Sequence, residues 1–267
     1  FVPGDRDLVI DVVGTRVAVR ICEDIWGGDK ESTEADLVAV LNGSPFTLNK
    51  TAQRIEAARA FAAGKPIAYA NLSGGQDELV FDGESFVLDA AGNVTYRAGF
   101  DSGLWIAEAG QDFALLTDEK LFQVLVRGLR DYLAKTGQRK IVLGLSGGID
   151  SALCAALAAE AMGPQNVLGV SMPSRYSSDH SVTDAEQVAR NLGIDYRSVP
   201  IEKAHAAFES MLELSPLAKE NLQSRLRAVI LMGISNSESR LLLTTGNKSE
   251  VAVGYSTIYG DSDRKSV

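Results

Sequence analysis

The sequence is poor in the residues that build covalent or metal-based scaffolds. Its 267 residues include only two cysteines and two histidines. This argues against a disulfide framework or a zinc cluster. Cys154 lies in the small-residue stretch "ALCAALAA", which is typical of a helix packing face. His180 and His205 are far apart and look like surface or helix positions, so we expect no metal pair there.

Long apolar runs and an excess of positive charge are also missing. No run approaches the roughly 20 residues that span a membrane, and the start at Phe1 does not resemble a signal peptide. The formal charge of −9 repels nucleic acid. We therefore expect a globular cytoplasmic protein that binds neither membranes nor nucleic acids. Small anionic substrates remain open to it, because cations occur locally at Arg175, Arg225, Arg227 and Lys248.

The composition of the chain changes near residue 110. Residues 1–110 combine apolar strands, two hairpins with turns at Gly14-Thr15 and Ala91-Gly92-Asn93, and one helical pattern between Ser44 and Gly64. A polar linker is expected at 111–118. Residues 119–267 form the second expected domain, which opens with an amphipathic helix that ends at a glycine.

Strands alternate with helices in the second part, up to a long helical stretch that ends near Asn236. This alternation predicts an α/β fold with a doubly wound parallel sheet. Ligands of such sheets bind outside the carboxyl ends of the strands. Here those ends carry "SGGIDS", "MPSRYSS" and "TTGNKSE". The three polar loops are therefore expected to converge on one crevice. Arg175 and Tyr176 lie there without an assigned role.

The stretch "GLSGGIDS" stands between an apolar strand and a helix. Glycines permit close backbone approach, and a helix N-terminus attracts anions, so the loop predicts a phosphate site. Ser146 can bind a phosphate oxygen, and Asp150 fits if Mg²⁺ lies between it and the phosphates. The lysine of the Walker loop is absent. The pattern resembles the "SGGxDS" loop of the ATP pyrophosphatase family, which implies ATP as substrate. The predicted ATP-binding residues are Gly144, Leu145, Ser146, Gly147, Gly148, Ile149, Asp150 and Ser151.

Cys22 follows a buried-looking strand and precedes two acids. From the residues alone it is a small buried side chain or a nucleophile. The stretches "ICEDIW", "LNGSPF" and "ANLSGGQDELVFDG" resemble the carbon–nitrogen hydrolase, or nitrilase, superfamily. That resemblance implies a partial α-β-β-α sandwich and a cysteine that forms a thioester with an amide and releases ammonia. It also implies that Glu23 and Ser44 hold glutamine. The Glu–Lys–Cys triad cannot be completed, because no lysine precedes Cys22 and the family's glutamate and lysine do.

The chain as a whole resembles glutamine-dependent NAD⁺ synthetases, through "LGLSGGIDSAL", "LGVSMPSRYSSDHS", "ENLQSR" and "LLTTGNKSEVAVGYSTIYGD". The resemblance implies that ATP adenylates the carboxylate of deamido-NAD⁺ and that ammonia then displaces AMP. It places Thr245 at ATP, Asn221, Arg225 and Glu250 at deamido-NAD⁺, and Asp150 and Glu250 at Mg²⁺. For Lys248, two interpretations stay open: it contacts a phosphate, or it is a solvated surface lysine. The subunits of this family associate, which implies a homo-oligomer.

Two alternatives remain open: another amidotransferase of the ATP pyrophosphatase type, and a non-catalytic module that binds an adenine nucleotide. We also expect the sequence to be a broken piece of a longer chain. It starts inside a domain, "SPLAKEN" looks shortened, and "RKSV" does not match the family's continuation after Asp263.

Overall fold

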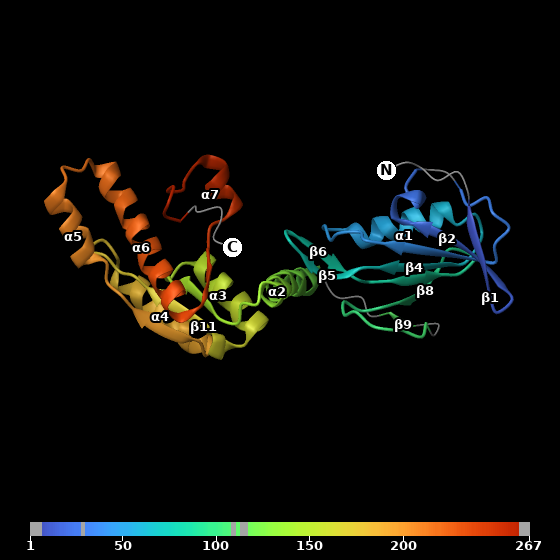
Figure 1. Cartoon of the computed structure of the whole chain (residues 1–267), viewed down its shortest axis with the longest axis horizontal. Coiled ribbons are helices and arrows are strands. Elements are labelled where there is room, and N and C mark those ends of the chain that lie inside the picture. The colour runs from blue at the N-terminus through green and yellow to red at the C-terminus, as the bar shows by residue number, and fades with distance from the viewer. Residues whose placement is uncertain (1–6, 28–29, 108–110, 113–116, 262–267) are drawn as a thin grey trace. The chain divides into compact units, whose positions relative to one another are not determined.

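The computed structural model describes residues 7–27, 30–107, 111–112 and 117–261 (Figure 1). Backbone contacts divide the chain into two compact units, Phe1–Tyr132 and Leu133–Val267. The division falls inside helix α2 (Thr117–Lys135), beyond the linker expected at 111–118. It does so because the first part of α2 is bonded to the first unit: Lys120 Nζ lies 2.6 Å from Asp82 Oδ2, and Asp131 Oδ2 accepts from Gly75 N at 2.7 Å. The proposed domain limits stay a prediction.

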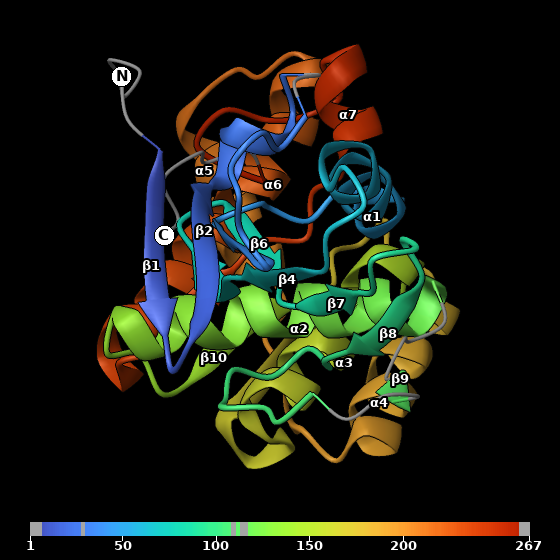
Figure 2. The ribbon, with the colours of Figure 1, turned by 90° about the vertical axis from the view of Figure 1, so that its right-hand side faces the viewer.

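The first unit contains a mixed seven-stranded sheet in the order β1-β2-β3-β4-β7-β8-β9. Strands β2, β3 and β4 are parallel, and both expected hairpins, β1–β2 and β7–β8, are antiparallel. Figure 2 shows β1 beside β2 at one edge of this sheet. The first turn has positive φ at Val13 and Gly14, as two-residue hairpins favour. The strands are Leu8–Val12, Thr15–Ile21, Leu37–Asn42, Ile67–Asn71, Phe86–Leu88, Val94–Arg97 and Gln111–Asp112.

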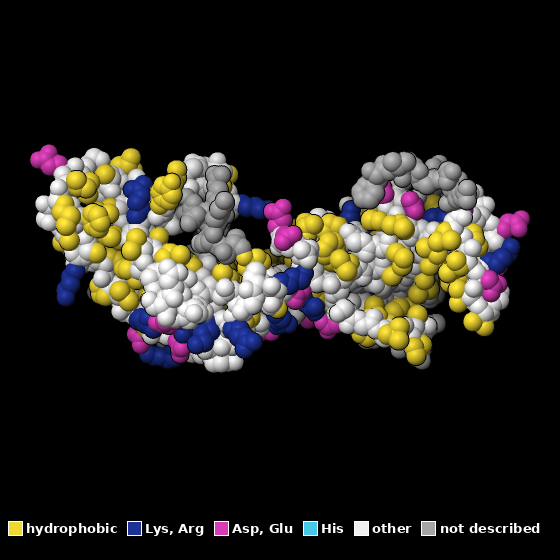
Figure 3. All heavy atoms as spheres, in the orientation of Figure 1, with side chains coloured by type: hydrophobic (Ala, Val, Ile, Leu, Met, Phe, Trp, Pro, Cys, Tyr) yellow, Lys and Arg dark blue, Asp and Glu magenta, His cyan; other side chains and the backbone are white. Residues whose placement is uncertain are grey.

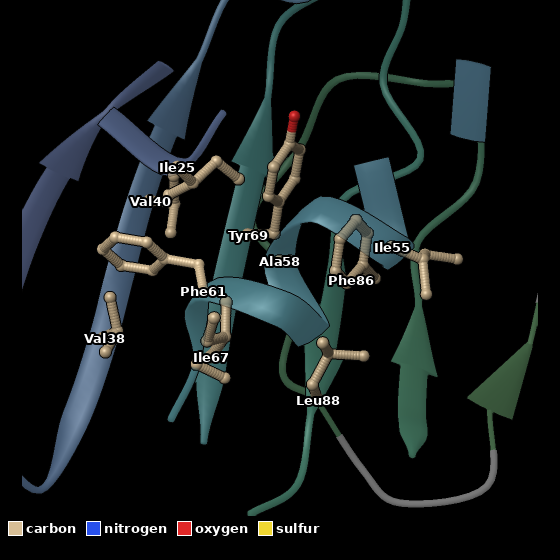
Figure 4. Packing of buried hydrophobic residues seen from close by; sticks show 11 residues of the cluster. Ile25, Val38, Val40, Ile55, Ala58, Phe61, Ile67, Tyr69, Phe86 and Leu88 are labelled. Carbon is tan, nitrogen blue, oxygen red and sulfur yellow. The ribbon is translucent and has the colours of Figure 1, made fainter. Parts of the chain in front are cut away.

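Helix α1 (Lys50–Phe61) covers one face of this sheet and completes its core (Figure 4). Alternate strand residues point to this face, as the period of two in a strand requires. Val38, Val40 and Ile67 are fully buried there, and the ring of Tyr69 stacks on Phe86 with centroids 4.5 Å apart. The opposite face is apolar but partly open: Ile21 and Leu41, paired across β2 and β3, are more than half exposed.

A second, two-stranded sheet was not expected. Strands β5 (Ser73–Gln76) and β6 (Leu79–Asp82) form a hairpin inside the nitrilase-like stretch. The local pattern hides β5, because Gly74 and Gly75 have low strand propensity. The glycines are used for close approach: a Cβ on Gly75 would lie 3.2 Å from the backbone of Gly128 in α2. The glycines thus let the hairpin pack closely against α2, where Asp131 accepts from Gly75 N.

The second unit has a four-stranded sheet in the order β12-β11-β10-β13, and every pair is parallel. This confirms the predicted doubly wound α/β class. After β12 the chain returns to the other side of β10, so the switch point lies between β10 and β13. The elements are β10 (Ile141–Gly144), α3 (Ile149–Met162), η2 (Pro164–Asn166), β11 (Val167–Ser171), α4 (Asp179–Leu192), β12 (Asp195–Ser198), α5 (Glu202–Met211), α6 (Pro216–Glu238), β13 (Leu241–Leu243) and α7 (Lys248–Val253).

Both faces of the parallel sheet are covered. The cluster that contains Val142 packs against Ile230, Leu231 and Ile234 of α6. On the other face of the strand, Ile141 and Leu143 are fully buried as well. Continuous apolar strands of this kind are typical of parallel sheets. Exposed apolar side chains occur in both units (Figure 3), and those of the second unit include Phe208 on α5, Val229 on α6 and Val253 on α7. In the described part of the chain, no helix has the length and apolar character needed to cross a membrane.

The long helical stretch expected before Asn236 is two helices. Helix α5 ends at Met211, and α6 starts at Pro216. Proline suits the first turn of a helix but not its interior, and Ser215 Oγ accepts from Ala218 N at 3.3 Å as the N-cap. Ser215 and Lys219 are joined by a regular first turn, with Lys219 N donating to Ser215 O at 3.0 Å. The expected break after Asp263 lies outside the described residues.

Candidate active site

The glycine-rich loop has the strand–loop–helix setting that the sequence predicts. Strand β10 ends at Gly144, and α3 begins at Ile149. Ser151 Oγ accepts from Ser146 N at 3.2 Å and lies 3.1 Å from Ser146 Oγ, while Gly148 N donates to Ser146 Oγ. Gly147 has φ +81°, and a Cβ on it would meet Ser181 O at 2.4 Å. Only glycine fits there, so the loop can pack against the start of α4.

A cavity of about 310 Å³ opens beside this loop. It is lined by the segments that follow β10, β11 and β13, so the three polar loops meet as the strand order predicts. Of the predicted ATP-binding residues, Gly144, Leu145, Ser146 and Thr245 line it. Gly147, Gly148, Ile149, Asp150 and Ser151 do not line it, and Ile149 is 80% exposed. Their roles stay predictions.

A second cavity, of about 410 Å³, shares part of its wall with the first. Asn221 lines it, and Thr257 Oγ1 donates to Asn221 Oδ1 at 2.9 Å. The residues common to both cavities are Ser224, Arg227 and Asp261. Asp261 N donates to Ser224 Oγ at 3.1 Å. The chain therefore places two substrate-sized spaces side by side, with a polar boundary between them.

The two predicted metal ligands approach the same asparagine. Asn247 caps the short helix α7: its backbone N donates to Glu250 Oε2 at 3.0 Å, and its Oδ1 accepts from Glu250 N at 2.9 Å. Asn247 Nδ2 also lies 3.4 Å from Asp150 Oδ2. Two carboxylates near a phosphate loop suit Mg²⁺, which binds through one or two carboxylates and substrate phosphates. Among the described residues, no cluster of three or more His, Cys, Asp or Glu side chains forms a complete protein cage.

Two arginines that the sequence analysis named as local cations, Arg225 and Arg175, do not line either cavity. Arg225 lines neither cavity and donates from Nε to Ile258 O at 3.2 Å. Arg175 is paired with Glu202 and with Glu209 Oε2, the latter at 3.2 Å. Among the lining residues that were not predicted as site residues are Ser224, three residues after Asn221, and Arg227, two residues after Arg225. The helical period of "NLQSRLR" could have indicated Ser224, because residues three or four apart lie on the same face of a helix.

The remaining singled-out side chains of this unit lie outside the cavities. Tyr176 is 67% exposed. Lys248 and His180 are exposed on α7 and α4. His205 lies on α5 and is buried, so a surface position is excluded for it. Cys154 is half-buried on α3, where burial raises the pKa of its thiol. A raised thiol pKa does not favour a nucleophile.

Cys22 lies where β2 ends and a 3-10 turn, η1 (Cys22–Ile25), begins. Its φ of +42° is unusual for a non-glycine residue, and such strain gathers at functional sites. Asp24 Oδ2 accepts from Ile21 N at 2.8 Å and closes the turn, while buried Ile25 anchors it. The thiol is partly exposed, and Glu23 is exposed beside it. This geometry presents the cysteine at the rim of the sheet.

Ser44 is held from three sides in the buried interior of the same unit. Ser44 N donates to Asn71 Oδ1 at 3.0 Å, and Arg54 donates from Nε to Ser44 Oγ at 3.1 Å and from Nη2 to Ser44 O at 2.7 Å. Arg54 Nη1 also pairs with Asp82 Oδ1 at 2.7 Å, and both side chains are fully buried. A hydroxyl that accepts from a guanidinium keeps its own proton for another acceptor.

Lys120 extends this charged network into α2. Its Nζ lies 2.6 Å from Asp82 Oδ2, 2.5 Å from Glu84 Oε2 and 2.8 Å from Thr51 Oγ1. Thr51 also donates to Glu84. Buried charges are tolerated when each is paired and hydrogen-bonded, as here. No local pattern predicts this network, because residues in direct contact are up to 69 positions apart in the chain.

Tyr69 lies near both Cys22 and the Ser44 network. Its hydroxyl points away from Phe61, Ile67 and Leu88 (Figure 4). Burial raises its pKa to about 12, the Arg54 cation lowers it, and a charge on Cys22 raises it. The phenol therefore stays neutral across the physiological range. The fold brings Cys22 and Ser44 to one neighbourhood, whereas their roles with glutamine stay predictions.

The comparisons with known proteins agree with this arrangement. A glutamine-dependent NAD(+) synthetase of Xanthomonas campestris pv. campestris is 43% identical over 291 aligned residues, which cover 97% of this chain and 51% of that protein. The structure of a glutamine-dependent NAD+ synthetase from Acinetobacter baumannii in complex with ADP superposes with TM-score 0.91 at 37% identity, covering 98% of this chain and 54% of that one. An NH3-dependent NAD synthetase from Campylobacter jejuni matches 54% of this chain and 62% of its own, with TM-score 0.51 and 32% identity.

This chain spans about half the length of the curated relatives it matches. The family model described as NAD synthase matches residues 121–265, which contain the phosphate loop and both cavities. The chain belongs to the NAD synthase family.

Proposed function

We propose that this chain carries out the amidation of deamido-NAD⁺ to NAD⁺ at the expense of ATP, as part of a glutamine-dependent NAD⁺ synthetase. The observation that carries the proposal is the pair of adjoining cavities in the second unit. One holds the phosphate loop with Ser146, and the other holds Asn221. Two substrates that must meet head to head, ATP and a dinucleotide carboxylate, need this arrangement.

In the proposed reaction, the nicotinate carboxylate attacks the α-phosphorus of ATP and pyrophosphate leaves. Ammonia then attacks the acyl-adenylate, and AMP leaves. The loop Gly144–Ser151 and Thr245 bind ATP, and Asn221, Arg225 and Glu250 bind deamido-NAD⁺. Asp150 and Glu250 hold Mg²⁺, which neutralises charge on the phosphates when bound. Support comes from their shared approach to Asn247, at 3.4 and 3.0 Å.

The first unit is proposed to supply the ammonia. Cys22 acts as the nucleophile toward the glutamine amide and forms a thioester, while Glu23 and Ser44 hold the substrate. The strained φ of Cys22 and the tightly held Ser44 support these roles. We propose domain limits of 1–110 and 119–267, a homo-oligomeric assembly, and a cytoplasmic location. Neither nucleic acid nor membrane is a proposed partner.

The test is the full-length protein with Cys22→Ala. A methyl group cannot attack a carbonyl, so NAD⁺ formation from glutamine should fall to background. Formation from ammonium chloride should stay within about twofold of wild type, because the second unit has its own core. Ser210→Ala, an exposed hydroxyl on α5, is the control and should change neither. Unchanged glutamine-dependent activity in Cys22→Ala would show that the cysteine is only a structural residue. Absence of deamido-NAD⁺ turnover in the wild type would overturn the whole proposal.

A further inference from the structure

Arg227 occupies the boundary between the two cavities of the second unit. It lies on α6 and lines both spaces, together with Ser224 and Asp261. Its Nε donates to Met172 O at 3.1 Å, just after β11 ends. This bond fixes the stem of the guanidinium at the carboxyl edge of the sheet, and within the described ranges no residue bonds to its two terminal nitrogens.

No carboxylate neutralises Arg227 among the residues that the structure describes. Four arginines of this unit have carboxylate partners, for example Arg190 with Glu186 at 2.8 Å and Arg197 with Glu238 at 2.8 Å. Arg225 donates only to Ile258 O, but it is exposed and lines neither cavity. Asp261 shares both cavities with Arg227, but its Oδ1 accepts from Thr257 N at 2.6 Å and no ion pair joins the two. Burial lowers the pKa of Arg227, and no opposing charge contributes. A partly buried cation without a counter-ion is costly, so its place in a cavity points to an anionic ligand.

Phosphate is the anion that fits these donors. The guanidinium is planar and offers paired N–H groups that match two phosphate oxygens, and it stays protonated at any pH at which the protein functions. The first cavity also contains Ser146 of the phosphate loop. A phosphate that reaches the shared boundary from this loop lies where the second substrate enters.

We propose that Arg227 is a catalytic residue that binds the α-phosphate of ATP and stabilises the charge that develops on it during adenylation. The inference rests on the proposed function. In this step, a carboxylate oxygen of deamido-NAD⁺ forms a bond to the α-phosphorus. The bond from that phosphorus to the bridging oxygen breaks, and pyrophosphate leaves with the electron pair. No proton moves, so the need is for a fixed positive charge rather than for an acid or base.

The experiment compares Arg227→Met and Arg227→Lys in the full-length protein with Arg190→Met as the matched control. Arg227→Met removes the charge, and Arg227→Lys keeps the charge but loses the paired N–H groups of the guanidinium. Arg190→Met removes an exposed arginine on α4. The readout is ATP–pyrophosphate exchange that depends on deamido-NAD⁺, measured without a nitrogen source. Loss of one such donor typically costs about 10²- to 10³-fold in kcat. We expect that loss in Arg227→Met, a smaller one of about 10-fold in Arg227→Lys, and none in Arg190→Met.

Three results would overturn the role of Arg227 specifically. They are exchange within twofold of wild type in Arg227→Met, a raised KM for ATP at unchanged kcat, or equal losses in the methionine and lysine variants. If Arg227→Met does not fold, as judged by its thermal unfolding, the lysine variant carries the test through its kcat. Failure of the wild type to exchange pyrophosphate with deamido-NAD⁺ would instead contradict the proposed function.

Discussion

Arg54 in the first unit is fully buried and Arg227 in the second is partly buried, and their surroundings are opposite. Arg54 donates to Ser44, Pro45 and Asp82, and its side chain is fully buried. Arg227 has one backbone acceptor, Met172 O, and borders two cavities. A buried cation whose N–H groups all have partners in the protein holds the fold together. A buried cation that lacks such partners lowers the stability of the fold until an anionic ligand binds to it. The partners of a buried charge therefore separate structural groups from ligand-binding ones.

The largest expected effect is the loss of stability on replacing Arg54, the arginine whose partners all lie within the protein. Arg54→Met leaves Asp82 buried with Lys120 as its remaining cation, and breaking a buried pair in this way costs about 3–5 kcal/mol. Both tryptophans of the chain, Trp26 and Trp105, precede Tyr132, so their fluorescence during urea unfolding reports the first unit. The double variant Arg54→Met/Asp82→Leu should recover much of the loss, because neither charge is then stranded. Unfolding of Arg54→Met at the wild-type urea concentration would break the comparison.

The next largest effect concerns Asp150, a carboxylate that we propose binds Mg²⁺. Asp150→Asn keeps the shape of the side chain but removes its charge from the proposed metal site. Pyrophosphate release with ammonium as nitrogen source should fall about 100-fold or more, while the thermal unfolding temperature should stay within about 2 °C. The exposed Asp195→Asn is a control of equal chemistry. Undiminished pyrophosphate release would contradict the metal role.

The smallest expected effect is the pH-dependent stability that Glu31 contributes, as another buried charge of the first unit that has partners within the protein. Glu31 is buried, and burial raises its pKa, but hydrogen bonds from Thr33 and Arg20 outweigh burial and hold the pKa below its usual 4.5. A lowered folded-state pKa adds stability above the unfolded pKa, and this stability is lost as the pH falls through the folded value. Glu31→Gln should cost about 1–3 kcal/mol at pH 7 and less below pH 4. The urea midpoint, followed by tryptophan fluorescence from pH 7 to 3, measures this. An equal loss at every pH would assign the effect to packing instead.

Motifs predicted the second unit better than the first. The parallel sheet and the meeting of three loops followed from alternating strands and helices, since chain order and the rules for crossovers leave few arrangements. In the first unit the hairpins at Gly14 and Gly92 were also readable, because turn residues are local. The β5–β6 hairpin was not readable, because Gly74 and Gly75 have low strand propensity and the close approach of Gly75 to Gly128 depends on a residue far along the chain.

The sequence by itself determined the glycine-rich loop that we propose binds phosphate, the parallel sheet around it and the candidate cysteine, since each depends on neighbouring residues and on the period of a helix or strand. Only the tertiary structure decided which charges are satisfied. It bonded Arg54 to Ser44 and Asp82, and it left Arg227 rather than Arg225 at the boundary of the two cavities. The physical reason is that a charge is stabilised by whatever lies within a few ångströms of it. Those neighbours come from distant parts of the chain.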